Sequence, residues 1–227
     1  MTKFFDPNIV RKSNISNKNL KFISGTDIAL PSVVEISESG TCNRVCSFCP
    51  RSDPNYPDIN EFISEKLHTK LFKELSDYNY SGSVIYSGFV EPLLDKNIYE
   101  LIGTARKYLP LSNIEIITNG DVLNKDRLKK LFDKGLTTIL ISVYDSKEDA
   151  ELFEELCVGS GLKKEQYVIR HRYLPPEQDY GITMSNRGGL LKDAVHSIQP
   201  LAKSLKAPCY YPSYTFFVDY NGDVLMC

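Results

Sequence analysis

The sequence predicts an α/β fold in which a parallel sheet is built from repeated strand–helix units. Short runs rich in β-branched and other apolar residues alternate along the chain with longer segments whose apolar residues recur at helical spacing. The strand runs are largely apolar rather than alternating, which is typical of a sheet covered on both faces. Five such units without a reversal signal favour a partial parallel (β/α)6-type barrel over a flat, doubly wound sheet.

Five segments have the composition of buried parallel strands. They are residues 33–36, 83–86, 114–117, 138–143 and 167–173. Each crossover between neighbouring strands should be right-handed. The sequence does not decide whether a sixth barrel strand lies between residues 181 and 208.

Helices are predicted between these strands from their caps and their apolar spacing. Ser64, Asn124 and Ser146 are candidate N-caps, because a side-chain oxygen at that position accepts a bond from a free amide of the first turn. The helix after Asn124 should end at Gly135, since glycine is favoured just past a helix C-terminus. A further helix is predicted over residues 93–109.

The C-terminal residues are predicted to form a β-hairpin. Residues 214–218 and 223–226 are rich in aromatic and β-branched residues and flank Tyr220-Asn221-Gly222. An Asn-Gly pair between two such runs is the strongest short-range signal for a tight hairpin turn. The fold class is therefore a partial parallel barrel with a short C-terminal hairpin extension.

Composition excludes several classes of function. The 227 residues carry a formal net charge of −2, which is unlike the basic footprint of a nucleic-acid-binding protein. No apolar run approaches the roughly 18 residues of a membrane span, and the charged N-terminus with Pro7 is unlike a signal peptide. No GxGxxG or GxxxxGK[ST] phosphate loop is present. We therefore expect a cytoplasmic protein whose cysteines are reduced.

Three of the six cysteines form a compact motif directly after the first strand. Cys42, Cys46 and Cys49 have C-x3-C-x2-C spacing in a loop flanked by Gly40 and Pro50. Such clustering in a reducing compartment indicates metal binding or catalysis rather than disulfides. Three interpretations remain open: free thiols, a zinc site that needs a fourth ligand such as His68, or an iron–sulfur cluster with one iron left open.

Other polar residues follow the ends of the later strands. The segment 87–92 follows the second strand and residues 118–120 follow the third, while Ser142 lies near the end of the fourth. Arg170 and Arg172 share one face of the fifth strand, because side chains alternate with a period of two. Ligands in parallel α/β folds bind beyond the carboxyl ends of the strands, so these residues should share a rim with the cysteine loop.

The cysteine motif resembles the signature of the radical S-adenosylmethionine superfamily. Cys42, Cys46 and Cys49 match it letter for letter, which implies that they bind a 4Fe–4S cluster and act as the catalytic centre. Phe48 stands where the family commonly places an aromatic residue against the adenine of S-adenosylmethionine.

The resemblance also suggests the residues that bind S-adenosylmethionine. Residues 87–92 resemble the GGEP segment that binds the methionine amino group: Glu91 and Pro92 agree, and Val90 stands where glycine is usual. Residues 118–120 resemble the segment near the ribose. The implied cofactor-binding residues, besides Phe48, are Gly88, Phe89, Val90, Glu91, Thr118, Asn119, Ser142 and Arg170.

The tail carries a second, partial resemblance. Cys209, Gly222 and Cys227 form a C-x12-G-x4-C pattern similar to the start of the SPASM or twitch extension, which implies an auxiliary iron–sulfur cluster at Cys209 and Cys227. A complete cluster usually needs four cysteines, so the pattern favours a truncated extension. The expected organisation is an N-terminal segment over residues 1–32, a radical S-adenosylmethionine core over 33–205, and the start of the extension over 206–227.

The function implied by this resemblance is radical catalysis. A reduced 4Fe–4S cluster would cleave S-adenosylmethionine to a 5′-deoxyadenosyl radical that takes hydrogen from an unidentified substrate, either a small molecule such as a sugar or a peptide. The enzyme would need a low-potential electron donor that resembles flavodoxin or ferredoxin. The alternatives are a non-catalytic zinc- or cluster-binding scaffold and an inactive, truncated remnant.

Overall fold

The computed structural model describes residues 21–46, 49–57, 59–173 and 214–225, and it shows one mostly parallel sheet. The strand order is β5-β4-β3-β2-β1-β6-β7, and all neighbours are parallel except the antiparallel pair β6–β7. The strands are β1 (Val33–Ile36), β2 (Ser83–Tyr86), β3 (Asn113–Thr118), β4 (Thr138–Val143), β5 (Tyr167–His171), β6 (Thr215–Val218) and β7 (Val224–Leu225). The predicted fold class is confirmed.

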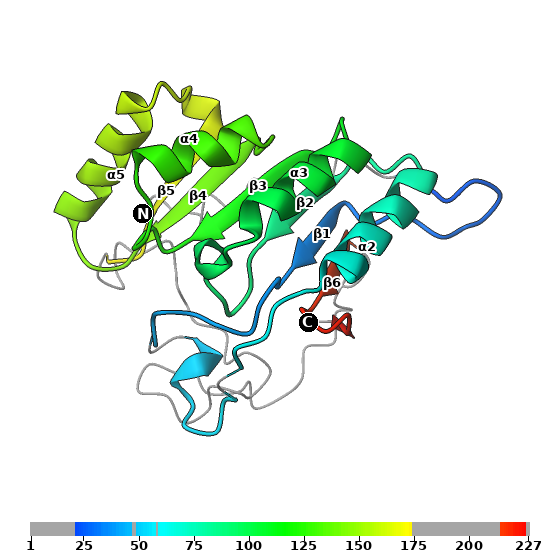
Figure 1. Ribbon diagram of the computed structural model, residues 1–227, viewed down its shortest axis with the longest axis horizontal. Coiled ribbons are helices and arrows are strands. Elements are labelled where there is room, and N and C mark those ends of the chain that lie inside the picture. The colour runs from blue at the N-terminus through cyan, green and yellow to red at the C-terminus, as the bar shows by residue number, and fades with distance from the viewer. Residues whose placement is uncertain (1–20, 47–48, 58, 174–213, 226–227) are drawn as a thin grey trace, which may run out of the picture.

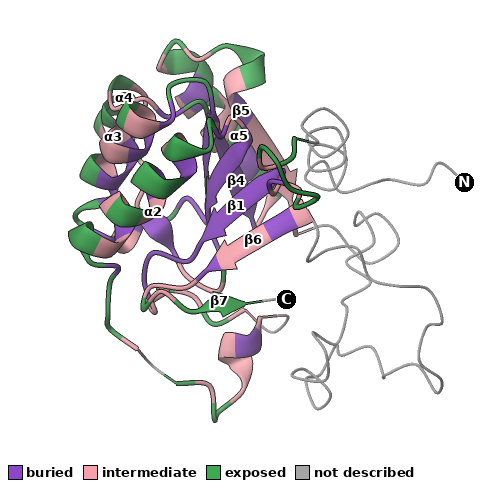
Figure 2. Cartoon of the chain, turned by 90° about the vertical axis from the view of Figure 1, so that its right-hand side faces the viewer, coloured by how far each residue is buried: buried purple, intermediate pink, exposed green. Residues whose placement is uncertain are grey.

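Four helices cover one face of this sheet (Figures 1 and 2). They are α2 (Glu65–Asp77), α3 (Ile98–Tyr108), α4 (Lys125–Asp133) and α5 (Lys147–Gly159). The three candidate caps act as predicted: Ser64, Asn124 and Ser146 each accept a hydrogen bond from an amide of the first helical turn. No helix in the described ranges is long and apolar enough to cross a membrane.

The hydrophobic core lies between the sheet and the helices. Alternate strand residues such as Val34, Ile36 and Ile116 pack against helical residues such as Phe72 and Ile102, and all five are almost fully buried. The residues between them on the strands point to the other face. The period of two thus separates an apolar, helix-covered face from a face that carries polar groups.

That second face carries a row of residues at one level of the sheet. Glu35 on β1 lies beside Ile85 on β2, which lies beside Glu115 on β3. Both glutamates are buried, and the Ser87 hydroxyl donates to Glu35 Oε1 at 2.5 Å. The strand segments are mostly apolar in sequence, but the face of the sheet away from the helices also carries buried polar side chains.

The predicted helix over residues 93–109 is wrong at its N-terminal end. Residues Pro92–Leu94 form a short 3-10 helix, and α3 begins only at Ile98. The reason is local capping: Glu91 Oε1 accepts from the Leu93 amide at 3.0 Å, and Asp95 Oδ1 accepts from the Asn97 amide at 2.8 Å. These local side-chain bonds to the backbone compete with helix formation, so the helix starts only after them.

The C-terminal hairpin forms, but it is part of the main sheet. Its first strand, β6, pairs in parallel with β1, from Val33 opposite Thr215 to Ile36 opposite Val218. Its turn contains Gly222 at a φ of 92°, a conformation that glycine adopts without strain. The region between residues 181 and 208, where a sixth barrel strand was left open, lies outside the described residues.

Candidate functional site

The cysteine loop leaves β1 at the carboxyl edge of the sheet and is held there by backbone bonds. The Ser37 amide donates to Val218 O at 2.9 Å, and the Ser87 amide donates to Ile36 O at 2.9 Å. The Glu91 amide then donates to Thr41 O, also at 2.9 Å, one residue before Cys42. The loops after β1 and β2 are thus joined at this edge.

The three thiols of the loop are partly exposed and close enough to influence one another. Cys42, Cys46 and Cys49 carry reduced thiols and are only partly buried. Burial, together with the neighbouring thiols of Cys49 and Cys42, raises the pKa of the Cys46 thiol to about 11. Burial likewise raises the pKa of Cys42. Without a metal the thiols of Cys42 and Cys46 are protonated near neutral pH, so metal binding must release their protons.

The three thiols are donors of the kind that bind iron–sulfur clusters. Within the described parts of the chain, no three His, Cys, Asp or Glu side chains converge as a ready-made site for one ion. A cluster binds each thiolate through a different iron, so its ligands need not meet at one point. His68, the candidate fourth zinc ligand, is buried beside Phe72, and its Nε2 lies 2.8 Å from the Tyr86 hydroxyl.

Glu91 occupies the centre of the site. Its side chain is 1% exposed. Oε1 accepts from the Thr118 hydroxyl at 2.6 Å and from the Leu93 amide, while Oε2 accepts from the Asn119 amide at 2.7 Å. Burial raises the pKa of Glu91, and these hydrogen bonds oppose that rise. A carboxylate has about four acceptor positions, so one remains on Oε2 for a cationic ligand.

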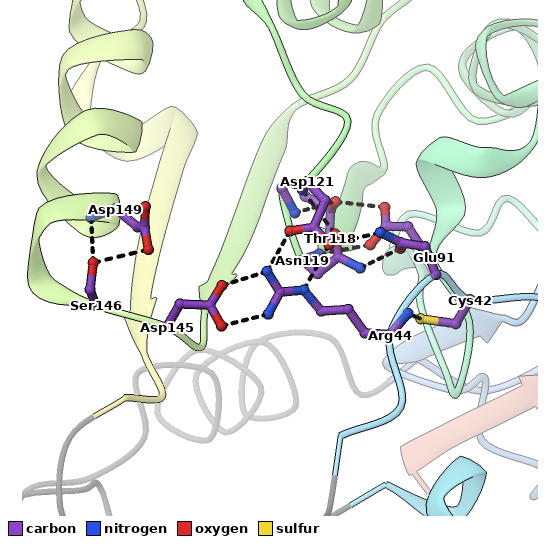
Figure 3. A network of polar contacts seen from close by, with 11 residues as sticks. Cys42, Arg44, Glu91, Thr118, Asn119, Asp121, Asp145, Ser146 and Asp149 are labelled. Carbon is purple, nitrogen blue, oxygen red and sulfur yellow. Dashed lines mark hydrogen bonds and ion pairs between the residues drawn. The ribbon is translucent and has the colours of Figure 1, made fainter.

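A second network ties the cysteine loop to the ends of β3 and β4 (Figure 3). Asn119 Nδ2 donates to Asn43 Oδ1 at 2.8 Å, and Asn43 Nδ2 donates to Asp121 Oδ2 at 2.7 Å. Arg44 forms ion pairs with both Asp121 and Asp145. Our sequence reasoning selected Asn119 but missed the other four. The available signal was their position: Asn43 and Arg44 lie inside the cysteine motif, and Asp121 and Asp145 lie shortly after the ends of β3 and β4.

Ser142 and Arg170 meet across neighbouring strands. They are directly paired in the β4–β5 register, and Arg170 donates to Ser142 Oγ from Nε at 3.2 Å and from Nη2 at 2.7 Å. Tyr144 joins this pair: burial raises its pKa, a hydrogen bond to Ser142 opposes that rise, and Cys46 is among the groups close enough to affect it. Tyr144 was not predicted from the sequence. It connects the Ser142–Arg170 pair to the cysteine loop.

The segment after β2 approaches the end of β1 closely. Gly88 has a φ of 136°, and a Cβ there would lie 2.8 Å from Ser37 Oγ, so the position requires glycine. Phe89 packs edge-on against Tyr56 with the ring centroids 6.4 Å apart. Val90, where the family pattern has glycine, is partly buried before Glu91. The remaining predicted site residues, Phe48, Cys209 and Cys227, lie outside the described residues.

Glu38, behind the cysteine loop, predicts a pH-dependent stability. The residue is completely buried, its Oε2 has no hydrogen-bond partner among the described residues, and burial raises its pKa to about 8. The folded chain therefore retains a proton that the unfolded chain loses at lower pH. Between about pH 5 and pH 8, the free energy of unfolding should fall for the wild type relative to Glu38→Gln, by about 1 kcal/mol per pH unit. Urea unfolding across this range measures the difference, and parallel curves would contradict the prediction.

Comparison with known proteins identifies a family and relatives that this chain resembles. The family model of the radical SAM superfamily matches residues 36–174. The chain is 29% identical over 198 residues to the S-adenosyl-L-methionine-dependent 2-deoxy-scyllo-inosamine dehydrogenase of Niallia circulans, a match that covers 86% of this chain and 73% of that protein. It is 31% identical over 142 residues to the GTP 3′,8-cyclase of Clostridium perfringens, covering 60% of this chain and 41% of the cyclase.

A solved structure shows the same fold. BtrN in complex with AdoMet and 2-DOIA superposes with a TM-score of 0.71 and 26% sequence identity. The superposition covers 88% of this chain and 74% of that one. The matched region contains the cysteine loop and the ends of β1 to β5, where the predicted site residues in the described ranges lie.

Proposed function

The chain belongs to the radical SAM superfamily, and on this premise we propose that it is an iron–sulfur enzyme that dehydrogenates a small hydroxylated molecule. The observation that carries the proposal is the junction of the three-thiol loop with Glu91, through the Glu91 amide and Thr41 O. This junction joins the loop that carries the three thiols to the segment that carries a buried carboxylate. The relatives with matching sequence are named as a dehydrogenase and a cyclase, and both are enzymes.

The proposed cofactors are a 4Fe–4S cluster and S-adenosylmethionine. Cys42, Cys46 and Cys49 would hold three irons and leave the fourth open to the amino and carboxylate groups of S-adenosylmethionine. When bound, the two cofactors together supply the hydrogen-abstracting radical chemistry of the family. The donor set supports this assignment, because thiolates are the usual cluster ligands.

The chain's own residues would orient S-adenosylmethionine at this edge. Glu91 would accept a hydrogen bond from an N–H of the amino group at the position left on Oε2, while Thr118 and Asn119 hold the Glu91 carboxylate from the other side. Ser142 and Arg170 would contact the cofactor's carboxylate or ribose hydroxyls, since Arg170 supplies a positive charge that the Ser142 hydroxyl orients. The burial of Glu91 excludes water and strengthens its interaction with a charge.

The proposed substrate class comes from the dehydrogenase relative. Sequence identity of 29% over most of the chain and a TM-score of 0.71 with BtrN both favour a hydroxylated small molecule over a peptide. Cys209 and Cys227 are proposed to contribute to an auxiliary cluster, which would double the iron content of the chain. A reduced flavodoxin or ferredoxin is the proposed electron donor.

Anaerobic reconstitution tests this function directly. The purified chain is loaded with iron and sulfide, its metal and sulfide contents are measured, and electron paramagnetic resonance spectra of the reduced protein are recorded with and without S-adenosylmethionine. We expect about four irons for one cluster, or about eight with an auxiliary cluster, and a spectrum that changes on adding S-adenosylmethionine. Incubation with 2-deoxy-scyllo-inosamine should then yield a ketone. Stoichiometric zinc with no spectral response would instead support the scaffold alternative.

A further inference from the structure

Arg44 lies inside the cysteine motif, but its side chain extends away from the Cys42 thiol towards Asp121 and Asp145 (Figure 3). Nε donates to Asp121 Oδ2 at 2.7 Å, and Nη2 contacts Asp121 Oδ1 at 2.5 Å. On the other side, Nη1 and Nη2 donate to the two oxygens of Asp145 at 3.0 and 2.6 Å. One guanidinium therefore bridges the ends of β3 and β4 with two-point contacts to each carboxylate.

The surroundings of Arg44 indicate a stable contact rather than a solvated charge. The side chains of Arg44 and Asp121 are 24% and 27% exposed, whereas Asp145 is 59% exposed. The guanidinium carbon also lies 5.4 Å from the centre of the Tyr144 ring. The Arg44 guanidinium holds the pKa of Asp145 below its usual value. The Asp121 contact, being less exposed, should contribute more than the Asp145 contact.

The neighbouring residues of the loop show why such a contact is needed. Val45, between Arg44 and Cys46, is 72% exposed, so it does not anchor the loop in the core. The side chain of Asn43 joins the same network through Asn119 and Asp121. In the stretch from Cys42 to Cys46, the polar side chains of Asn43 and Arg44 therefore provide the anchorage that apolar burial does not.

We propose that Arg44 is a positioning residue that holds the cysteine loop against the ends of β3 and β4 before any cluster is bound. Its importance for catalysis rests on the proposed function, because only a cluster-binding loop needs this preorganisation. Lysine would not replace it, since an ammonium group is a point charge and does not bridge two carboxylates with two-point contacts. Arg44→Lys should therefore retain only part of the contact that holds the cysteine loop.

Hydrogen exchange of the metal-free protein tests this proposal without using activity. We expect the amides of residues 43–46 to exchange about fivefold faster in Arg44→Gln, the effect of losing a charge-assisted contact of intermediate exposure. Asp121→Asn should produce most of this increase and Asp145→Asn less. Lys134→Gln, which breaks the partly exposed pair of Lys134 with Glu100 elsewhere on the chain, is the matched control and should leave the loop unchanged.

The exchange of β3 amides serves as the folding control and should be equal in all variants. Equal exchange of the loop in Arg44→Gln and wild type would overturn the proposal. A second measurement follows loss of iron to a chelator from the reconstituted protein, which should be about fivefold faster in Arg44→Gln. If the wild type takes up no iron, the proposed function fails, while the exchange data still decide whether Arg44 positions the loop.

Discussion

Replacing Cys46 with serine is expected to prevent assembly of the cluster. The variant loses one of three thiolate ligands, and the hydroxyl that replaces it is a much poorer ligand for iron. Iron content after anaerobic reconstitution should fall to the background level, and S-adenosylmethionine should no longer change the electron paramagnetic resonance spectrum. Turnover should fall more than about 100-fold, the upper loss seen when only an outer partner of a metal ligand is removed.

Cys157→Ser is the matched control for this variant. Cys157 is a free cysteine on α5 that is fully buried in the hydrophobic core. Serine there buries a hydroxyl and should lower stability, but iron content and the response to S-adenosylmethionine should remain those of the wild type. Full iron content in Cys46→Ser, or an equal loss in Cys157→Ser, would contradict the assignment of the C-x3-C-x2-C loop as the cluster site.

Replacing Glu91 with glutamine is expected to weaken S-adenosylmethionine binding and to lower stability together. The amide removes the negative charge from the proposed amino-group contact, and its NH2 group must face a donor: the Thr118 hydroxyl, the Leu93 amide or the Asn119 amide. Unfolding free energy of the metal-free chain should fall by about 1–3 kcal/mol, the cost of leaving a buried polar group unpaired. The dissociation constant for S-adenosylmethionine should rise at least about tenfold in the reconstituted protein.

Glu100→Gln separates this effect from a general loss of charge. Glu100 pairs with Lys134 at the surface, with its side chain 72% exposed, so its replacement should change neither urea unfolding nor binding. Urea unfolding and equilibrium dialysis with labelled S-adenosylmethionine provide the two measurements. Wild-type binding by Glu91→Gln in a folded, iron-loaded protein would show that the carboxylate serves only to cap and join the loops.

The sequence alone was sufficient for the parts of the fold that depend on neighbours along the chain. Short apolar runs rich in β-branched residues identified the first five strands, and the caps at Ser64, Asn124 and Ser146 fall where the side-chain oxygens were expected to bind amides. The start of α3 was misplaced, because Glu91 and Asp95 cap a separate short turn. The spacing of apolar residues does not reveal a polar side chain that binds nearby backbone amides and delays the start of a helix.

The sequence also predicted that site residues would gather at one edge, because the carboxyl ends of parallel strands coincide. It did not predict their partners. Glu91 meets Thr118 only because β2 and β3 pair in a particular register, and Ser142 meets Arg170 because β4 and β5 do. A shift of one residue in either pairing would turn those side chains to the opposite face.

Residue types and their spacing were enough to place a three-thiol loop after the first strand of a parallel α/β fold. How that loop is held follows only from the folded chain. Arg44 contacts Asp121, 77 residues away, and Asp145, 101 residues away, and β6 pairs with β1 from the far end of the chain. Such contacts depend on strand order and register, which are set by packing of the whole sheet and leave no local pattern in the chain.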